Sequence, residues 1–187
     1  MNAQTKNHPP DVTNVVIAGL GGQGVLKASD ILADAAFRAG YDVKKSELHG
    51  MSQRGGSVAS DVRFGEEVLS PMVPRGEADY LVLLAPEELE PNRHRLRDGG
   101  MVIGSTLDEK SLPNRRSINV ALLGALSSHL SIGEEHWIAA IRAYLPEKLH
   151  ADNEQAFALG REHESKRTDK VCRGEGPQSR GNTGKAP

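Results

Sequence analysis

The stretch NVVIAGLGGQGVL, residues 14–26, decides the fold. Residues 14–19 are a short, almost wholly apolar and β-branched run, which is typical of a strand buried on both faces. Glycine then occupies four of the six positions 19–24. From position 25 to 39 apolar residues recur at helical spacing, and Gly40 follows where a helix C-cap glycine belongs. This stretch therefore predicts a strand, a glycine loop and a helix.

The rest of the chain continues this alternation. Strands are expected at 41–48, 78–84 and 101–105, and residues 57–64 should form a β-hairpin with 68–73, turning at 65–67. A short helix should open at Pro86 and end at Gly99 and Gly100, and further helices are expected at 119–130, 134–145 and 152–164. The order predicts an α/β fold: a three-layer α/β/α sandwich with a mostly parallel sheet, one β-hairpin and a Rossmann-like first strand–helix unit.

Composition indicates one globular domain with flexible ends. The chain has 187 residues, of which 37% are hydrophobic and 26% charged, and its net charge of −2 argues against a broad nucleic-acid surface. Residues 1–13 are polar and lack a signal-peptide core, so we expect a flexible arm and a cytoplasmic protein with no membrane contact. Residues 166–187 hold six Lys or Arg against two Asp or Glu and are expected to be a disordered basic tail. The domain should span 14–165.

The glycine loop is the first candidate site. Gly19, Gly21 and Gly24 satisfy G-x-G-x-x-G between a predicted strand and a helix, with Gly22 and Gln23 between them. Glycines let the backbone approach a ligand, and the N–H groups that open the helix attract an anion. A phosphate or carboxylate contact is one interpretation, and tight packing of the helix on the strand is the other.

A dinucleotide site would also need an acid at the end of the second strand. Glu47 lies 23 residues past Gly24, close to the expected place. Two details weaken this interpretation: the dinucleotide pattern gives no reason for Gln23, and Lys44 and Lys45 precede the acid.

The second candidate segment is HGMSQRGGS, residues 49–57, which follows the second predicted strand. It should lie at the same end of the sheet as the glycine loop, where open α/β sheets bind ligands. Arg54 can pair with a carboxylate or phosphate, and the other candidate binding residues supply a titratable group, hydrogen bonds or close backbone approach: His49, Ser52, Gln53, Gly55 and Gly56. A solvated surface loop is the alternative.

Catalytic groups are harder to find. Cys172 is the single cysteine, whereas an iron–sulfur cluster normally takes four thiolates. The remaining histidines show no metal spacing, and we find no nucleophile elbow, paired cysteines, P-loop lysine or Ser-His-Asp set. We therefore assign no catalytic residue and no metal site, and expect this chain to work with a partner.

Five motifs in order resemble a known family. The stretches IAGLGGQGVL, ELHGMSQRGGSVASDVRFG, SPMVPRGEADYLVLLAPEEL, SINVALLGAL and HADNEQAFALG are similar to the gamma-type subunit of 2-oxoacid:ferredoxin oxidoreductases, over residues 14–160. The segment HGMSQRGG, residues 49–56, most resembles the corresponding segment of the small subunit of the indolepyruvate type.

The resemblance implies a division of labour. The family oxidatively decarboxylates a 2-oxoacid with thiamine diphosphate, passes electrons through iron–sulfur clusters to ferredoxin and transfers the acyl group to coenzyme A. In the indolepyruvate type a large alpha subunit carries the thiamine site and the clusters, so this chain would hold neither. The two candidate segments would then form one surface that holds a phosphate-bearing part of coenzyme A or docks against the large subunit, with Arg54 as the main anion partner.

Two other functions also fit the sequence. A stand-alone NAD-binding Rossmann-type dehydrogenase module fits the glycine spacing and Glu47, but lacks a substrate domain. A scaffold without any part in the chemistry would merely support a partner.

Overall fold

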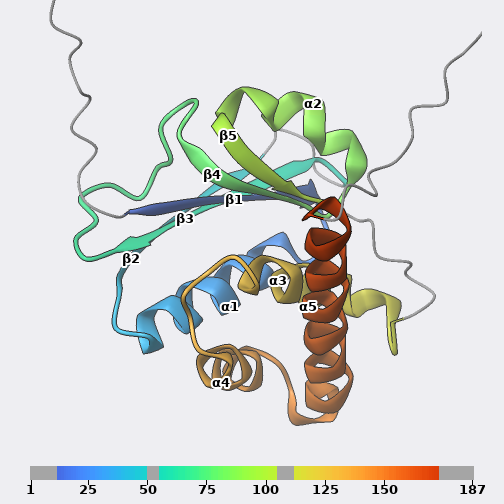
Figure 1. Ribbon diagram of the computed structural model, residues 1–187. Coiled ribbons are helices and arrows are strands. Elements are labelled where there is room, and N and C mark those ends of the chain that lie inside the picture. Colours follow the sequence, from blue (N-terminus) through green and yellow to red (C-terminus); the bar gives the residue numbers. More distant parts are fainter. Residues whose placement is uncertain (1–11, 50–54, 105–111, 173–187) are drawn as a thin grey trace, which may run out of the picture.

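The computed structural model describes residues 12–49, 55–104 and 112–172. They form a five-stranded sheet in the order β2-β3-β1-β4-β5 (Figure 1). The strands are β1 (Thr13–Leu20), β2 (Asp42–His49), β3 (Ser57–Gly65), β4 (Ala78–Leu83) and β5 (Leu96–Ile103). β1, β4 and β5 pair in parallel, whereas β3 runs antiparallel to both β1 and β2. Four strands of the described sheet therefore point the same way, and β3 is reversed between two of them.

The opening stretch folds as its pattern predicts. β1 lies in the middle of the sheet, and its residues 15–18 are wholly buried, as expected for an apolar run covered on both faces. α1 (Val25–Arg38) follows and buries the stripe Ala28, Ile31, Leu32 and Ala35. Gly40 has a φ of 93°, and its N–H donates to the carbonyl of Phe37 over 3.0 Å. It therefore ends the helix as a left-handed glycine.

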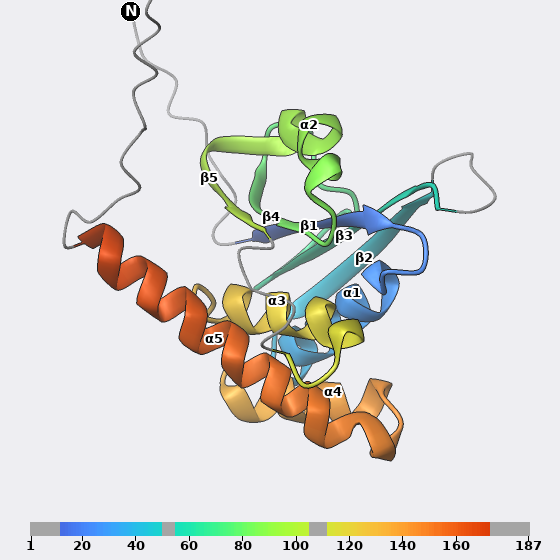
Figure 2. The same cartoon turned by 90° about the vertical axis from the view of Figure 1, so that its right-hand side faces the viewer.

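The two faces of the sheet are covered unequally. α1, α3 (Ile118–Ser127), α4 (Glu134–Tyr144) and α5 (His150–Cys172) pack on one face and enclose the larger core (Figures 1 and 2). The other face carries the segment 66–77 and three short helices: η1 (Pro86–Glu88), α2 (Leu89–Asn92) and η2 (Arg93–Arg95). The α/β sandwich is confirmed, with one thick and one thin outer layer.

The predicted hairpin has a different second strand. β3 is a strand as expected, but residues 68–73 are not, and β3 pairs instead with β2. Both edges of β3 are already occupied, by β1 and β2, so no edge is left for 68–73. Side chains satisfy the backbone there: Asp61 accepts from the Val73 N–H and Asp42 from the Val68 N–H, both over 2.9 Å.

The helix predicted from Pro86 to the glycine pair is too long. Helical structure ends at Arg95, and β5 begins at Leu96, so Gly99 and Gly100 lie inside a strand. A Cβ on Gly100 would come within 2.8 Å of the Ala78 carbonyl oxygen. The pair therefore lets β5 approach β4 where their register shifts, which the sequence alone did not distinguish from a helix end.

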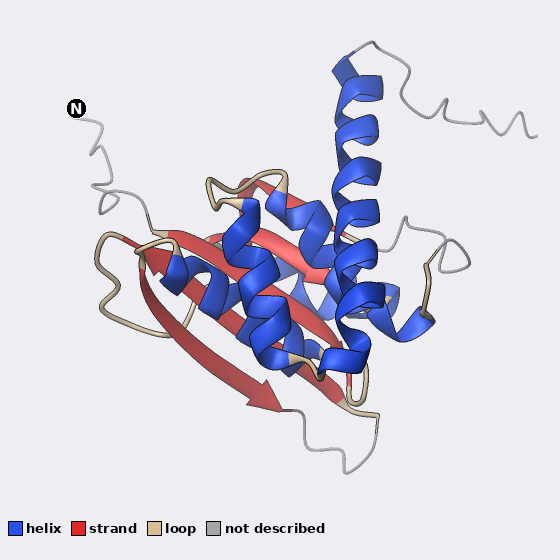
Figure 3. Cartoon of the chain, turned by 90° about the horizontal axis from the view of Figure 1, so that it is seen from below, coloured by secondary structure: helices blue, strands red, loops and turns tan. Residues whose placement is uncertain are grey.

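α3 and α5 cross closely beneath the sheet (Figure 3). A Cβ on Gly124 would lie 2.0 Å from the Phe157 carbonyl oxygen, and one on Gly160 would lie 1.8 Å from that of Ala121. The two glycines thus let the backbones touch.

α5 begins at His150 rather than 152 and runs to Cys172, seven residues into the range predicted as a disordered tail. Of the predicted arm 1–13, residues 1–11 lie outside the described residues, as does the segment 173–187, whereas Thr13 already belongs to β1. None of the helices that the structure describes has both the length and the apolar character needed to cross a bilayer.

Candidate functional site

The two glycine segments meet at one edge of the sheet. β1 and β2 both end there, with Leu20 opposite Ser57 and His49 opposite Val58 (Figure 2). The Gly21 N–H donates to the carbonyl of Gly56 over 2.9 Å, so the segments share a backbone hydrogen bond. The sequence placed both segments at the carboxyl ends of their strands, and their contact joins them into one surface.

Gln23 has a structural role that the G-x-G-x-x-G pattern does not explain. Its Oε1 accepts the Leu20 N–H over 2.7 Å, and its own N–H donates to the Leu20 carbonyl over 3.1 Å. A Cβ on Gly19 would lie 2.9 Å from this Oε1 and equally close to the Leu84 Cβ. Gln23 therefore closes the turn after β1, and Gly19 leaves the space in which its side chain lies.

Asn119 holds the far end of the loop. Gly24 caps α1 with a left-handed φ of 83°, and its carbonyl accepts the Asn119 Nδ2 over 3.3 Å. The Asn119 Oδ1 accepts the Val120 N–H over 2.9 Å, which fixes the amide. A Cβ on Gly24 would lie 2.6 Å from Nδ2. Asn119 was not predicted as a site residue, although it is the one amide in the apolar run INVALLGAL, which is the signal that could have identified it.

The first turn of α1 faces outward into a hollow. Its N–H groups have no acceptor within the helix, so they are available to an anion together with the helix dipole. The described first turn carries Lys27 and no acidic side chain. A hollow of about 460 Å³ opens here, lined by Leu20, Gly21, Gly22, Gly24, Val25, Leu26, Lys27 and Val58. Gly22, with a φ of 96° and no neighbour near its missing Cβ, leaves it open.

Glu47 is poorly placed for a dinucleotide ribose. β3 lies between its strand and β1, which sets β2 about 9–10 Å from β1 rather than the usual spacing of about 4.8 Å. Its carboxylate accepts Lys45 Nζ over 2.8 Å. Burial alone would lower the pKa of Lys45, but its hydrogen bonds to Asp30 and Glu47 outweigh burial and raise that pKa. The Lys45 ammonium therefore ties β2 to α1, and Glu47 belongs to that link.

The remaining candidate site residues fall into two groups: glycines that the structure describes, and residues whose side chains it does not describe. Gly55, with a φ of 67°, and Gly56 lie beside Gly21. His49 ends β2, but its side chain lies outside the described part, as do Ser52, Gln53 and Arg54. Their roles stay predictions.

Several titratable groups elsewhere have structural partners. Asp79 accepts the Asn14 N–H over 2.7 Å and pairs with Arg97 over 2.8 Å. His129 Nε2 lies 3.0 Å from a Glu164 oxygen, and His150 Nε2 lies 2.7 Å from the Leu145 carbonyl. In the described ranges no group of three or more His, Cys, Asp or Glu could hold a metal ion.

Comparison with known proteins gives a consistent result. The family model described as pyruvate ferredoxin/flavodoxin oxidoreductase matches residues 14–116. The chain is 43% identical to the indolepyruvate oxidoreductase subunit IorB of Thermococcus kodakarensis, in a match covering 79% of this chain and 93% of that protein.

Two solved structures share the fold. A keto/oxoacid ferredoxin oxidoreductase gamma subunit from Geobacter sulfurreducens has a TM-score of 0.69 at 23% identity, covering 82% of this chain and 99% of its own. The 2-oxoglutarate:ferredoxin oxidoreductase from Magnetococcus marinus, solved with 2-oxoglutarate, coenzyme A and succinyl-CoA bound, has a TM-score of 0.74 at 22% identity. That match covers 83% of this chain but 31% of the other, so the same fold is there part of a longer polypeptide.

Proposed function

Because the chain belongs to the pyruvate ferredoxin/flavodoxin oxidoreductase family, we propose that it is the small subunit of a complex that oxidatively decarboxylates an aryl pyruvate such as indolepyruvate. The observation that carries this proposal is the 43% identity to an indolepyruvate oxidoreductase subunit over nearly the whole of that protein. The comparisons do not support the stand-alone NAD-binding dehydrogenase, and the position of β3 between β1 and β2 also argues against it.

The chemistry is divided between polypeptides in this proposal. Thiamine diphosphate and iron–sulfur clusters on the large subunit would supply carbanion stabilisation and one-electron transfer to ferredoxin. Cys172, the sole cysteine of the chain, cannot supply the four thiolates of a cluster. This chain would act by binding and orientation instead.

The edge formed by the two glycine segments is the part that we assign to this role. The N–H groups of the α1 first turn and the hollow in front of them suit a phosphate of coenzyme A, whereas the Lys27 ammonium lies over the Tyr144 ring, 5.7 Å from its centroid. Arg54 would be the main anion partner, by its guanidinium, and the helix N-terminus the second. The same edge would face the large subunit near the thiamine, since the acyl group must pass to coenzyme A there.

Substrate choice is tested on the assembled complex. We expect this chain, co-expressed with the large subunit, to support coenzyme A-dependent ferredoxin reduction with indolepyruvate at a kcat/KM at least tenfold above that with pyruvate or 2-oxoglutarate. A preference for either of these smaller acids would refute the aryl-pyruvate assignment.

Arg54→Ala tests the anion contact. Loss of a charged hydrogen bond to phosphate costs about 1.5–3 kcal/mol, which is roughly a 10- to 150-fold rise in the KM for coenzyme A. The matched control is Arg38→Ala at the opposite end of α1, where the arginine pairs with Asp34 on the surface. An unchanged KM and unchanged assembly in Arg54→Ala would remove this residue from the site.

A further inference from the structure

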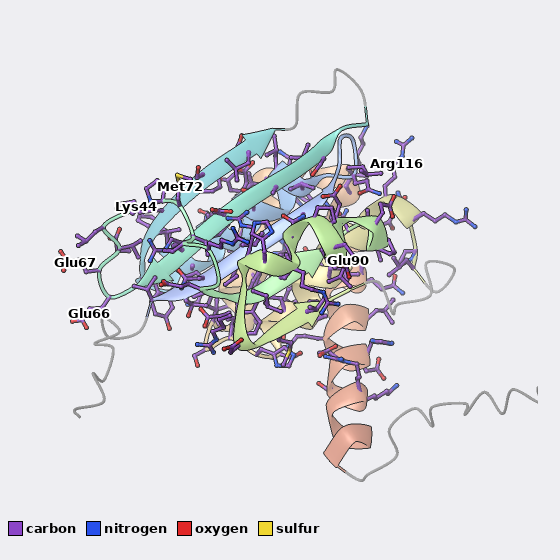
Figure 4. All side chains as sticks on the ribbon, turned by 90° about the horizontal axis from the view of Figure 1, so that it is seen from above. Lys44, Glu66, Glu67, Met72, Glu90 and Arg116 are labelled. Atoms are coloured by element: carbon purple, nitrogen blue, oxygen red, sulfur yellow. The ribbon has the colours of Figure 1, made fainter. Side chains whose placement is uncertain are left out.

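The thin face of the sheet carries a groove over its β2–β3 side. The groove has a volume of about 710 Å³, and we define it by its apolar lining: Leu48, Ala59, Met72, Val73, Pro74 and Pro91. We call it the Met72 groove. Figure 4 looks onto this face and shows Met72 over the sheet, with Glu66 and Glu67 at the tip of the same segment 66–77 and Glu90 on the short helices.

Large apolar side chains are exposed at the groove. Of the lining residues, Leu48 is 41% exposed and Met72 54%; Leu69, which lies outside the lining but in the same segment 66–77, is 88% exposed. They are three of the five large hydrophobic side chains exposed in the described part of the chain; the others are Phe37 and Tyr144, on the helical side. Grouped apolar exposure of this kind marks an interaction surface.

The backbone that presents these side chains is held in place. Asp42 accepts the Val68 N–H, buried Asp61 accepts the Val73 N–H, and Arg63 Nη1 donates to the carbonyls of Ser70 and Met72 over 2.9 and 3.2 Å. Asp61 also pairs with Arg95 over 2.6 Å, which fixes η2 at the other wall. The backbone that carries these apolar side chains is thus already ordered, so binding of a partner costs less conformational entropy.

Polar side chains at the rim of the groove indicate which charge a partner should carry there. Arg75 and His94 line it, both are exposed, and neither has a hydrogen bond or ion pair within the residues that the structure describes. A carboxylate on the partner would complement Arg75. A second copy of this chain fits worse, because a two-fold contact would bring the Arg75 guanidinium of both copies into one interface.

The groove also continues to the candidate site. Leu48 and Ser57, which line it, flank the segment 49–56 on either side. The groove therefore begins at the two residues that border the segment 49–56, which the proposed function assigns to the large subunit. In the Magnetococcus marinus oxidoreductase this fold is 31% of a longer chain, so there it is joined to a larger polypeptide.

Resting on the proposed function, we propose that the Met72 groove is where the large subunit docks, through an apolar segment that carries a carboxylate. The test uses the full-length chain, tagged and co-expressed with the large subunit of its own organism. The variant is Leu69→Glu/Met72→Glu, and the matched control is Phe37→Glu, a 69% exposed side chain on the helical side.

The double variant should bind the large subunit at least tenfold more weakly than the wild type, with unchanged circular dichroism and melting temperature, whereas Phe37→Glu should bind normally. Arg75→Glu should also weaken binding, and the wild-type affinity should fall with added salt. Wild-type affinity in the double variant would overturn the docking site. A self-associated wild type that the double variant dissociates, without loss of the large subunit, would assign the groove to a second copy and also overturn it. Failure of the wild type itself to bind would instead refute the proposed function.

Discussion

Gln23 and Asn119 show how single side chains shape the candidate site. Gln23 bonds the backbone of Leu20 three residues away, and Asn119 reaches Gly24 from 95 residues along the chain. Together they hold both ends of the glycine loop, so the first-turn N–H groups of α1 keep one direction. The turn is therefore preorganised before any ligand arrives.

Gly24 should tolerate a side chain less well than Gly22. An L-residue at a left-handed φ costs about 1–2 kcal/mol, which should be the whole cost of Gly22→Ala because nothing lies near its Cβ. Gly24→Ala adds a contact of 2.6 Å with Asn119 Nδ2 and should cost about 1–3 kcal/mol more. Urea unfolding of both variants measures the difference. Equal costs, or no relief when Asn119→Ala is added to Gly24→Ala, would contradict this packing.

Glu164 should make stability depend on acid pH. Burial opposes its ionisation, but hydrogen bonds from Arg167 and His129 outweigh burial and lower the pKa of this carboxyl below its ordinary value. A lowered pKa stabilises the fold above the unfolded value of about 4.3, and the contribution disappears as pH falls through the folded pKa.

Glu164→Gln should therefore be less stable than the wild type at pH 7, by about 1–2 kcal/mol, and the gap should narrow as pH falls below about 4.3 and through the lowered folded pKa of this carboxyl. Denaturant unfolding at pH 7 and pH 3.5 provides the comparison. Glu162→Gln, at an exposed carboxylate paired with Lys166, should change little. A gap that stays constant with pH would show that the Glu164 charge contributes nothing.

At the scale of elements, local patterns identified β1, α1 and β3 but not which strands pair, and they wrongly predicted a strand at 68–73. The buried run of β1 and the apolar stripe of α1 were predicted because each is a property of consecutive residues. The alternation in 57–64 identified β3, yet it carries no information on whether 68–73 or β2 is its partner. That choice depends on Asp42, Asp61 and Arg63, whose bonds satisfy the backbone of 66–77 from other elements.

The crossing of α3 and α5 should not accept a methyl group. In Gly160→Ala the new Cβ would lie 1.8 Å from the Ala121 carbonyl oxygen, so the helices must separate, at a cost of about 3 kcal/mol or more. Gly133→Ala is the control, because the three atoms nearest its Cβ belong to the exposed, movable Glu135 carboxylate, and it should change stability by less than about 0.5 kcal/mol. Thermal melting distinguishes them; similar melting temperatures for the two variants would mean that the crossing is looser than described.

At the scale of the whole molecule, the sequence predicted the α/β class and the shared edge, because carboxyl ends of strands pointing the same way meet at one side of a sheet. It did not predict the thin layer or the Met72 groove. Both depend on where 66–77 and the short helices pack, and these contacts join residues far apart in sequence. Family resemblance supplied the reaction, which geometry alone would not have identified.

The most direct test of the shared-complex account is ferredoxin reduction by indolepyruvate and coenzyme A, measured with this chain alone, the large subunit alone and both together. We predict activity that appears, or rises at least a hundredfold, when both chains are present. Oxidation of indolepyruvate by this chain alone, or equal activity of the large subunit without it, would contradict the account.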